Sequence, residues 1–108
     1  MKIGVISGLP RESACLDTIK RAPGDFEISS GVGPGRAAHG AKAFIDAGAS
    51  GLLSFGVAGG LTEGAPAGAI ILADDVIDGD QRYFSDIGWR NKISESISDA
   101  CEVISGTL

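Results

Sequence analysis

The sequence predicts an α/β fold, a three-layer α/β/α arrangement in which helices cover both faces of a largely parallel, mixed central sheet. Short apolar runs typical of buried strands alternate with helical patterns, and parallel sheets joined by helices have this alternation. The chain has 108 residues, 44% of them hydrophobic and 21% charged, as in an ordinary globular protein. Its 17 glycines are unusual, because average usage is about 7%. We therefore expect turns at which the backbone closely approaches another group.

The first half of the chain is predicted to form three strands and two helices. The first strand is hydrophobic nearly throughout, as a strand covered on both faces would be. Pro10 then suits the first turn of a helix, where its missing N–H is no loss. The expected strands span residues 2–7, 25–30 and 52–55, and the expected helices span 10–21 and 36–49. The side chains expected to face inward are Cys15, Leu16 and Ile19 in the first helix and Ala37, Ala41, Phe44, Ile45 and Gly48 in the second.

The second half is predicted to contain one further strand and one further helix. The apolar run at residues 69–73 predicts the strand, and the acidic stretch at 74–86 is interpreted as a solvated loop. A helix is expected over 91–104, with Gly106 capping its end. One face of this helix would carry Ile93, Ile97, Cys101 and Ile104.

Glycine-rich turns follow the first three predicted strands, at Gly8, at residues 31–35 and at residues 56–60. Because the carboxyl ends of parallel strands meet at one edge of a sheet, we expect these turns to form one pocket with backbone N–H groups pointing into it. Gly33 and Arg36 open the second helix and are candidates for binding an anion. The alternative is that these glycines only allow tight packing of helices on the sheet. The turn is not a dinucleotide fingerprint, because its third glycine comes one residue early and no acidic residue follows the next strand.

Glu12 lies in the first turn of the first predicted helix, beside the same edge. A carboxylate at that position is favoured by the helix dipole, so it has a purely structural interpretation. The functional interpretation is a general base that takes a proton from an attacking water molecule. Both interpretations are consistent with the spacing.

Charge and cysteine content limit the classes of function. The net charge of −5 argues against nucleic acid as a partner, because an acidic chain is repelled by phosphates. With Cys15 and Cys101 far apart and His39 the sole histidine, no metal site is expected. We interpret the two cysteines as buried thiols of a cytoplasmic protein. No apolar run approaches the ~20 residues of a membrane span.

Three segments of the chain resemble a known family: MKIGVISGLPRES at residues 1–13, SGVGPGRAAHGAKAF at 30–44 and SFGVAGGLTEGAPAGAIILADDVI at 54–77. They are similar to the nucleoside phosphorylase and nucleosidase superfamily, which includes purine nucleoside phosphorylases and methylthioadenosine/S-adenosylhomocysteine nucleosidases. Its most specific element reads Ala58-Gly59-Gly60-Leu61 here and is followed by a turn at residues 66–68. The branch that the chain most resembles is the hopanoid-associated phosphorylases.

The resemblance implies cleavage of the N-glycosidic bond of a purine nucleoside by phosphate or water, without a cofactor. In the hopanoid branch the substrate would be an adenosylated hopanoid precursor. Glu12 matches the glutamate that orients and deprotonates the attacking water in nucleosidases, and Gly8 matches a glycine that helps to cradle phosphate in phosphorylases. Val57, Ala58 and Gly59 match the loop that lines ribose and base. Val57 stands where relatives have serine and Ser54 replaces a phosphate-binding arginine, which favours hydrolysis.

The resemblance covers nearly all of this chain but about half of the family's length. Residues 1–108 are therefore interpreted as the amino-terminal part of a phosphorylase-like domain. The family's acid for the departing purine and its ribose-binding Met-Glu pair belong to the other half. We expect the exposed sheet edge to be covered by a second copy, in a homo-oligomer, or by a second polypeptide. The alternatives are a non-catalytic module that binds a nucleoside or a protein, and an unrelated α/β protein with a coincidental glycine pattern.

Overall fold

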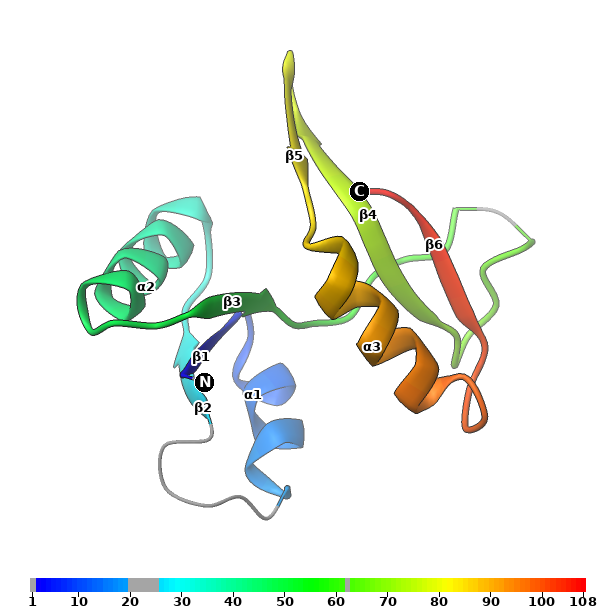
Figure 1. Cartoon of the computed structure of the whole chain (residues 1–108), viewed down its shortest axis with the longest axis horizontal. Coiled ribbons are helices and arrows are strands. Elements are labelled where there is room, and N and C mark those ends of the chain that lie inside the picture. Colours follow the sequence, from blue (N-terminus) through cyan, green and yellow to red (C-terminus); the bar gives the residue numbers. More distant parts are fainter. Residues whose placement is uncertain (1, 20–25, 62) are drawn as a thin grey trace. The chain divides into compact units, whose positions relative to one another are not determined.

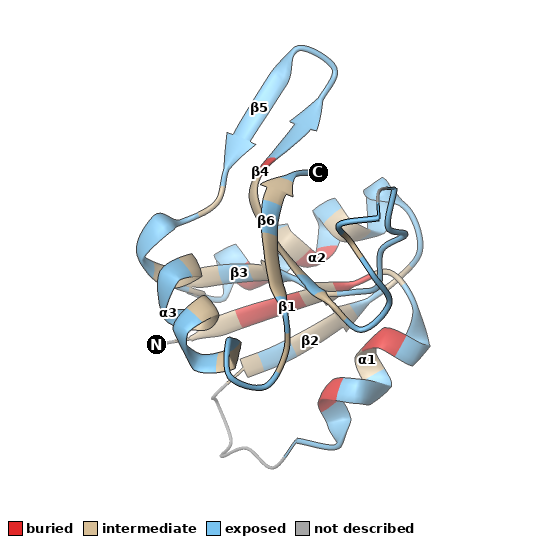
Figure 2. Ribbon diagram, turned by 90° about the vertical axis from the view of Figure 1, so that its right-hand side faces the viewer, coloured by how far each residue is buried: buried red, intermediate tan, exposed pale blue. Residues whose placement is uncertain are grey.

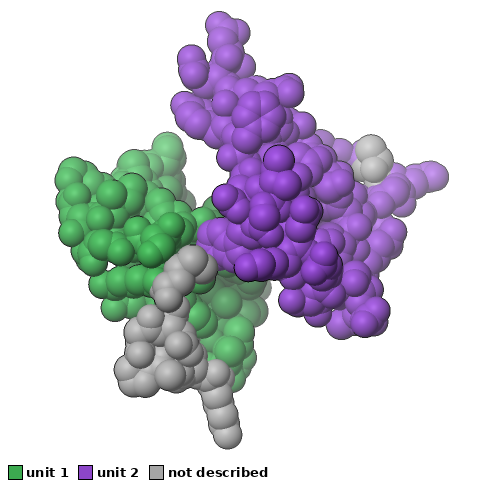
Figure 3. Space-filling model, viewed as in Figure 1, with its two compact units in different colours: residues 1–57 green, residues 58–108 purple. Residues whose placement is uncertain are grey.

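The computed structural model describes residues 2–19, 26–61 and 63–108. It divides into two compact units, Met1–Val57 and Ala58–Leu108, which Figure 3 distinguishes by colour. The strands form two three-stranded sheets, one within each unit, where the sequence predicts a single central sheet. Three of the four strand pairings found in the described residues are parallel and one is antiparallel. The α/β class and the largely parallel, mixed pairing are thus confirmed.

The first unit is a parallel β/α structure with strand order β2-β1-β3. In register, Ile3 of β1 lies opposite Phe26 of β2 and Gly51 of β3. All three strands therefore end at the same edge of the sheet, as predicted. The elements are β1 (Ile3–Ser7), α1 (Pro10–Asp17), β2 (Phe26–Ser30), α2 (Pro34–Asp46) and β3 (Gly51–Ser54), labelled in Figure 1.

The helices α1 and α2 cover opposite faces of the first sheet (Figure 1). The ring of Phe44 in α2 lies directly over Gly4, where a side chain would collide with it. The hydroxyl oxygens of Ser7 and of Ser13 in α1 are 2.6 Å apart. Since Gly4 and Ser7 are an odd number of residues apart on one strand, they face opposite sides of the sheet. The first unit therefore has the predicted three layers of helix, sheet and helix.

Among the described residues of the first unit, the buried hydrophobic side chains are few: Val5, Leu16 and Phe44, which lie on β1, α1 and α2. Figure 2 shows buried residues on these three elements. Helix α1 ends at Asp17, earlier than predicted, and the prediction's last residues, 20 and 21, lie outside the described residues. Cys15 and Ile19 are exposed, so the predicted inward stripe of α1 is correct only at Leu16.

Helix α2 begins two residues earlier than predicted, at Pro34, and ends at Asp46. Ile45, predicted to face inward, is 59% exposed, because it lies about 100° around the helix from the buried Phe44. Gly48, also assigned to the stripe, lies beyond the helix with φ +88°. The amide of Ala49 donates to the carbonyl of Phe44 at 2.9 Å, and the amide of Gly48 donates to that of Ile45 at 3.0 Å. These two bonds form a Schellman motif, which explains the glycine as a helix terminator.

The second unit is a mixed sheet with strand order β5-β4-β6 and one helix. Strand β4 pairs antiparallel with β5 and parallel with β6. The predicted loop at 74–86 is wrong, because most of it forms the second half of β4 and strand β5. A two-residue turn joins these strands, and its Gly79 has φ +59°, a conformation that such turns require of their first residue. The elements are β4 (Ile70–Asp78), β5 (Gln81–Phe84), α3 (Ile87–Ile97) and β6 (Val103–Thr107) (Figure 1).

The last predicted helix is displaced. Helix α3 starts at Ile87, where the Asp86 carboxylate accepts a hydrogen bond from the Trp89 amide at 2.7 Å, and it ends at Ile97. Ile104 and Gly106 belong to β6, so Gly106 is not a helix cap. An apolar residue every three or four positions continued past the real helix end, and short apolar runs do not distinguish helix from strand. Among the described residues, no helix is long and apolar enough to cross a membrane.

Candidate functional site

The carboxylate of Glu12 lies between the ends of β1 and β3. Its Oε1 accepts hydrogen bonds from the amides of Gly8 at 3.1 Å and Leu9 at 2.9 Å. Its Oε2 accepts one from the amide of Val57 at 2.8 Å. The residue is buried, with 9% of its surface exposed. Glu12 thus joins two turns that the sequence separates by more than forty positions.

The parallel pairing of β1 and β3 produces this geometry. Ile6 lies opposite Ser54, and the amide of Phe55 donates to the carbonyl of Ile6 at 2.9 Å, so the two strands end together. Helix α1 starts directly after the first turn and carries Glu12 in its third position, from which a glutamate reaches back to the amide that precedes the helix. In the strand order β2-β1-β3 the direction of the connections reverses beside β1. That reversal is where open α/β sheets bind ligands.

Backbone hydrogen bonds keep Glu12 ionised. The amides of Val57, Leu9 and Gly8 lower its pKa below the ordinary value of a glutamate, the Val57 amide most, and partial burial opposes them. The carboxylate is therefore charged at neutral pH. Two oxygens offer about four acceptor positions, and donors from the described residues fill three of them, two on Oε1 and one on Oε2. Within that part of the chain, Oε2 retains a position for a further donor.

The structure brings Gly8, Glu12 and Val57 together as the sequence predicts, whereas Gly33 and Arg36 are a separate pair. Gly33 precedes α2 with φ +94°, and the exposed Arg36 lies across Gly31, at which a Cβ would be 2.7 Å from Arg36 Cδ. Among the residues that the structure describes, no hydrogen bond or ion pair links Gly33 or Arg36 to Glu12.

Ala58 and Gly59 begin the second unit and are exposed. Ala58 lines a hollow of about 330 Å³ whose other walls are Gly60, residues 65–69 and Ile71. Small side chains and backbone form most of this hollow. Its described lining therefore offers space and peptide groups and includes no charged side chain.

The model of the phosphorylase superfamily matches residues 26–102. The chain belongs to the phosphorylase superfamily. The matched range contains Gly33, Arg36, Val57, Ala58 and Gly59, while Gly8 and Glu12 precede it. No curated protein and no solved structure was found to match the chain.

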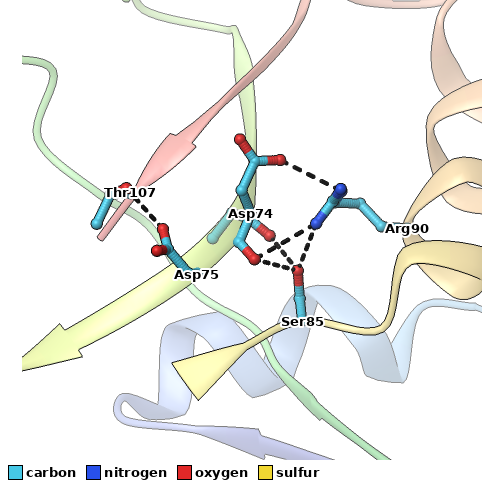
Figure 4. Close-up of polar contacts among 6 residues, drawn as sticks. Asp74, Asp75, Ser85, Arg90 and Thr107 are labelled. Carbon is cyan, nitrogen blue, oxygen red and sulfur yellow. Dashed lines mark hydrogen bonds and ion pairs between the residues drawn. The ribbon is translucent and has the colours of Figure 1, made fainter. Parts of the chain in front are cut away.

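The second unit of this superfamily member contains a polar cluster that the sequence did not predict (Figure 4). Asp75 is 3% exposed, accepts a hydrogen bond from the Thr107 hydroxyl at 2.6 Å and pairs with Arg82 at 3.1 Å. These contacts tie both outer strands, β5 and β6, to the central strand β4. The role of Asp75 is therefore structural.

The same cluster fixes the start of α3 against β4. Arg90 pairs with Asp74 at 3.3 Å and donates to the Ser85 hydroxyl oxygen at 2.9 Å, and that hydroxyl donates to the carbonyl of Ala73 at 2.6 Å. Figure 4 shows the contacts among Asp74, Ser85 and Arg90.

Metal-ligating side chains are not gathered in the described part of the chain, where no group of three or more His, Cys, Asp or Glu residues could hold an ion. The cysteines also differ from the prediction of two buried thiols. Cys15 is exposed on α1, and Cys101 is partly exposed.

Proposed function

We propose that the chain takes part in cleaving the N-glycosidic bond of a purine nucleoside, with water as the nucleophile and Glu12 as the group that orients it. The observation that carries this proposal is the ionised carboxylate of Glu12, held by three backbone amides across the ends of two neighbouring strands. A fixed negative charge attracts a water proton and repels phosphate, so this geometry favours hydrolysis over phosphorolysis. Membership of the phosphorylase superfamily supports the reaction class.

The chemistry requires a negative group where positive charge develops on the sugar. As the C–N bond breaks, its electron pair leaves with the purine and the anomeric carbon becomes cationic. The water oxygen bonds to that carbon and its proton passes to Glu12. Because its lowered pKa makes Glu12 a weak base, it accepts the proton only once the water has become acidic by bonding to carbon. The departing purine also needs a proton, and we assign that step to no residue of this chain.

The proposal is tested by following purine release from adenosine and from a 5′-substituted adenosine, with and without phosphate. We expect free adenine and free ribose at a rate that phosphate does not change. Formation of ribose 1-phosphate only when phosphate is present would replace water with phosphate as the nucleophile. Absence of release under both conditions would contradict catalysis by the chain.

A non-catalytic nucleoside-binding or protein-interaction module is the second candidate. The hollow beside Ala58 supports it, because backbone and small side chains can bind a flat base without any catalytic group. Calorimetric titration with adenosine distinguishes the candidates. Saturable binding without release of adenine would support the module, and release would exclude it.

Three finer statements belong to the same proposal. The similarity to the hopanoid branch supports a purine nucleoside with a lipid-like 5′ substituent, such as an adenosylated hopanoid precursor. Exposed apolar side chains on the β4–β5 hairpin, among them Tyr83 and Phe84, support a homo-oligomer, which light scattering would detect. The free thiols of Cys15 and Cys101 support a reducing, cytoplasmic compartment.

A further inference from the structure

We propose that Gly56 is a positioning residue, whose missing side chain leaves the space that the Glu12 carboxylate occupies beside the end of β3. A Cβ placed on Gly56 would collide with Glu12 Oε2 and would be 2.9 Å from Cδ and 3.3 Å from Oε1. All three atoms belong to the carboxylate. The first two contacts are closer than real Cβ atoms make, so a side chain at position 56 and this carboxylate position exclude each other.

The requirement for glycine at position 56 is one of space. Gly56 does not have a positive φ. The described glycines that do are Gly33, Gly48, Gly68, Gly79 and Gly106. A side chain at position 56 would therefore not be strained by a left-handed backbone. What an added methyl group would disturb is the neighbouring carboxylate.

If a side chain at position 56 displaced the Glu12 carboxylate, the hydrogen bonds of its two oxygens would be affected differently. Its Oε1 is bound to the amides of Gly8 and Leu9, which belong to the turn from which α1 starts. Its Oε2 reaches across to the amide of Val57, the residue that follows Gly56. A methyl group at position 56 displaces Oε2, so the bond to Val57 is lost first. Since that bond contributes most to lowering the pKa of Glu12, the pKa should rise toward its ordinary value.

The test is an NMR titration of the Glu12 side-chain carboxyl carbon in the wild-type chain and in Gly56→Ala. We expect a higher pKa in the variant and a changed chemical shift of the Val57 amide. Gly8→Ala is the matched control, because its Cβ would lie 3.7 Å from Glu12 Oε1, an ordinary contact, and its titration should match the wild type. An unchanged pKa and an unchanged Val57 amide in Gly56→Ala would overturn the inference.

A double-mutant cycle keeps the inference testable if Gly56→Ala folds poorly. In a Glu12→Ala background the carboxylate is gone, so adding Gly56→Ala should cost no further stability in urea unfolding. Equal losses from Gly56→Ala in both backgrounds would contradict the inference.

The catalytic consequence of Gly56 rests on the proposed function, whereas its effect on Glu12 does not. If the chain cleaves nucleosides, Gly56→Ala should lower kcat more than it changes KM and should shift the acidic limb of the pH profile upward. A shifted pKa without any cleavage in the wild type would contradict the proposed function alone. An unshifted pKa in a chain that cleaves nucleosides would contradict the role of Gly56 alone.

Discussion

Phe44→Ala should strongly destabilise the first unit, because this ring joins α2 to the central strand β1. Phe44 is 9% exposed and its ring lies over Gly4. Val5 and Leu16 are the other buried hydrophobic residues of the first unit's described part, so few contacts remain to compensate.

The expected magnitude follows from the buried area. A phenylalanine buries on the order of 150–250 Å², which at ~25 cal/mol per Å² corresponds to about 4–6 kcal/mol for the whole side chain. Alanine retains Cβ, so the free energy of unfolding should fall by about 3–4 kcal/mol, within the usual range for this substitution. In Phe44→Ala, removal of the ring would leave a cavity over Gly4, which has no side chain to fill it.

The assay is urea unfolding monitored by NMR signals of β1 amides, because Trp89 lies in α3 and reports the second unit. Ile45→Ala is the matched control. Ile45 is the next residue of α2 and is 59% exposed, so its loss should be below about 1 kcal/mol. Similar losses for both variants, or a loss below about 1 kcal/mol for Phe44→Ala, would refute this account of the core.

Three further predictions concern a buried acid, a helical glycine and pH. Asp75→Ala should cost about 2–3 kcal/mol in urea unfolding because Thr107 and Arg82 lose their acceptor. Asp75→Asn keeps an oxygen that can accept from the Thr107 hydroxyl, so its loss should be smaller; equal losses would contradict this. Gly35→Ala should raise the free energy of unfolding by about 0.5–1 kcal/mol, because Gly35 is helical and an added Cβ meets nothing within 4 Å. A lower urea midpoint in this variant would contradict the prediction. The wild type should be more stable to unfolding than Glu12→Gln at pH values above the pKa of an unfolded glutamate, about 4.3. This difference in stability should disappear as the pH falls through the lowered pKa of folded Glu12. A difference in stability that grows as the pH falls would contradict the prediction.

Local sequence patterns predicted the first unit well, because its strands and helices are short and clearly bounded. The glycine-rich turns follow β1, β2 and β3, and these strands end at one edge of one sheet. The errors occurred where tertiary structure decides. Ile45 is apolar, but its position around α2 leaves it exposed.

The second unit was predicted less well, because its acidic residues concealed a hairpin. Gly79-Asp80 lies between Val76-Ile77 and Tyr83-Phe84, and such a Gly-Asp pair between apolar residues is a hairpin signal. Burial of Asp75 could not be predicted, since it depends on Thr107 and Arg82 from two other strands.

The candidate site was predictable in its members but not in its contacts. The helix position of Glu12 and the edge of the sheet are readable from the sequence. The hydrogen bond to Val57 depends on the parallel register of β1 and β3, which the sequence does not specify. The same register brings Gly56 next to the carboxylate, so the sequence alone did not predict that the missing side chain of Gly56 leaves room for Glu12.

The most direct measurement is the rate of adenine release by Glu12→Gln, compared with the wild type and with Glu27→Gln, which changes an exposed glutamate of β2. An acceptor of the water proton contributes roughly 10²–10⁴-fold to such a reaction, so Glu12→Gln should slow release at least about 100-fold while Glu27→Gln leaves it unchanged. A Glu12→Gln chain that releases adenine within a few-fold of the wild-type rate would contradict the account.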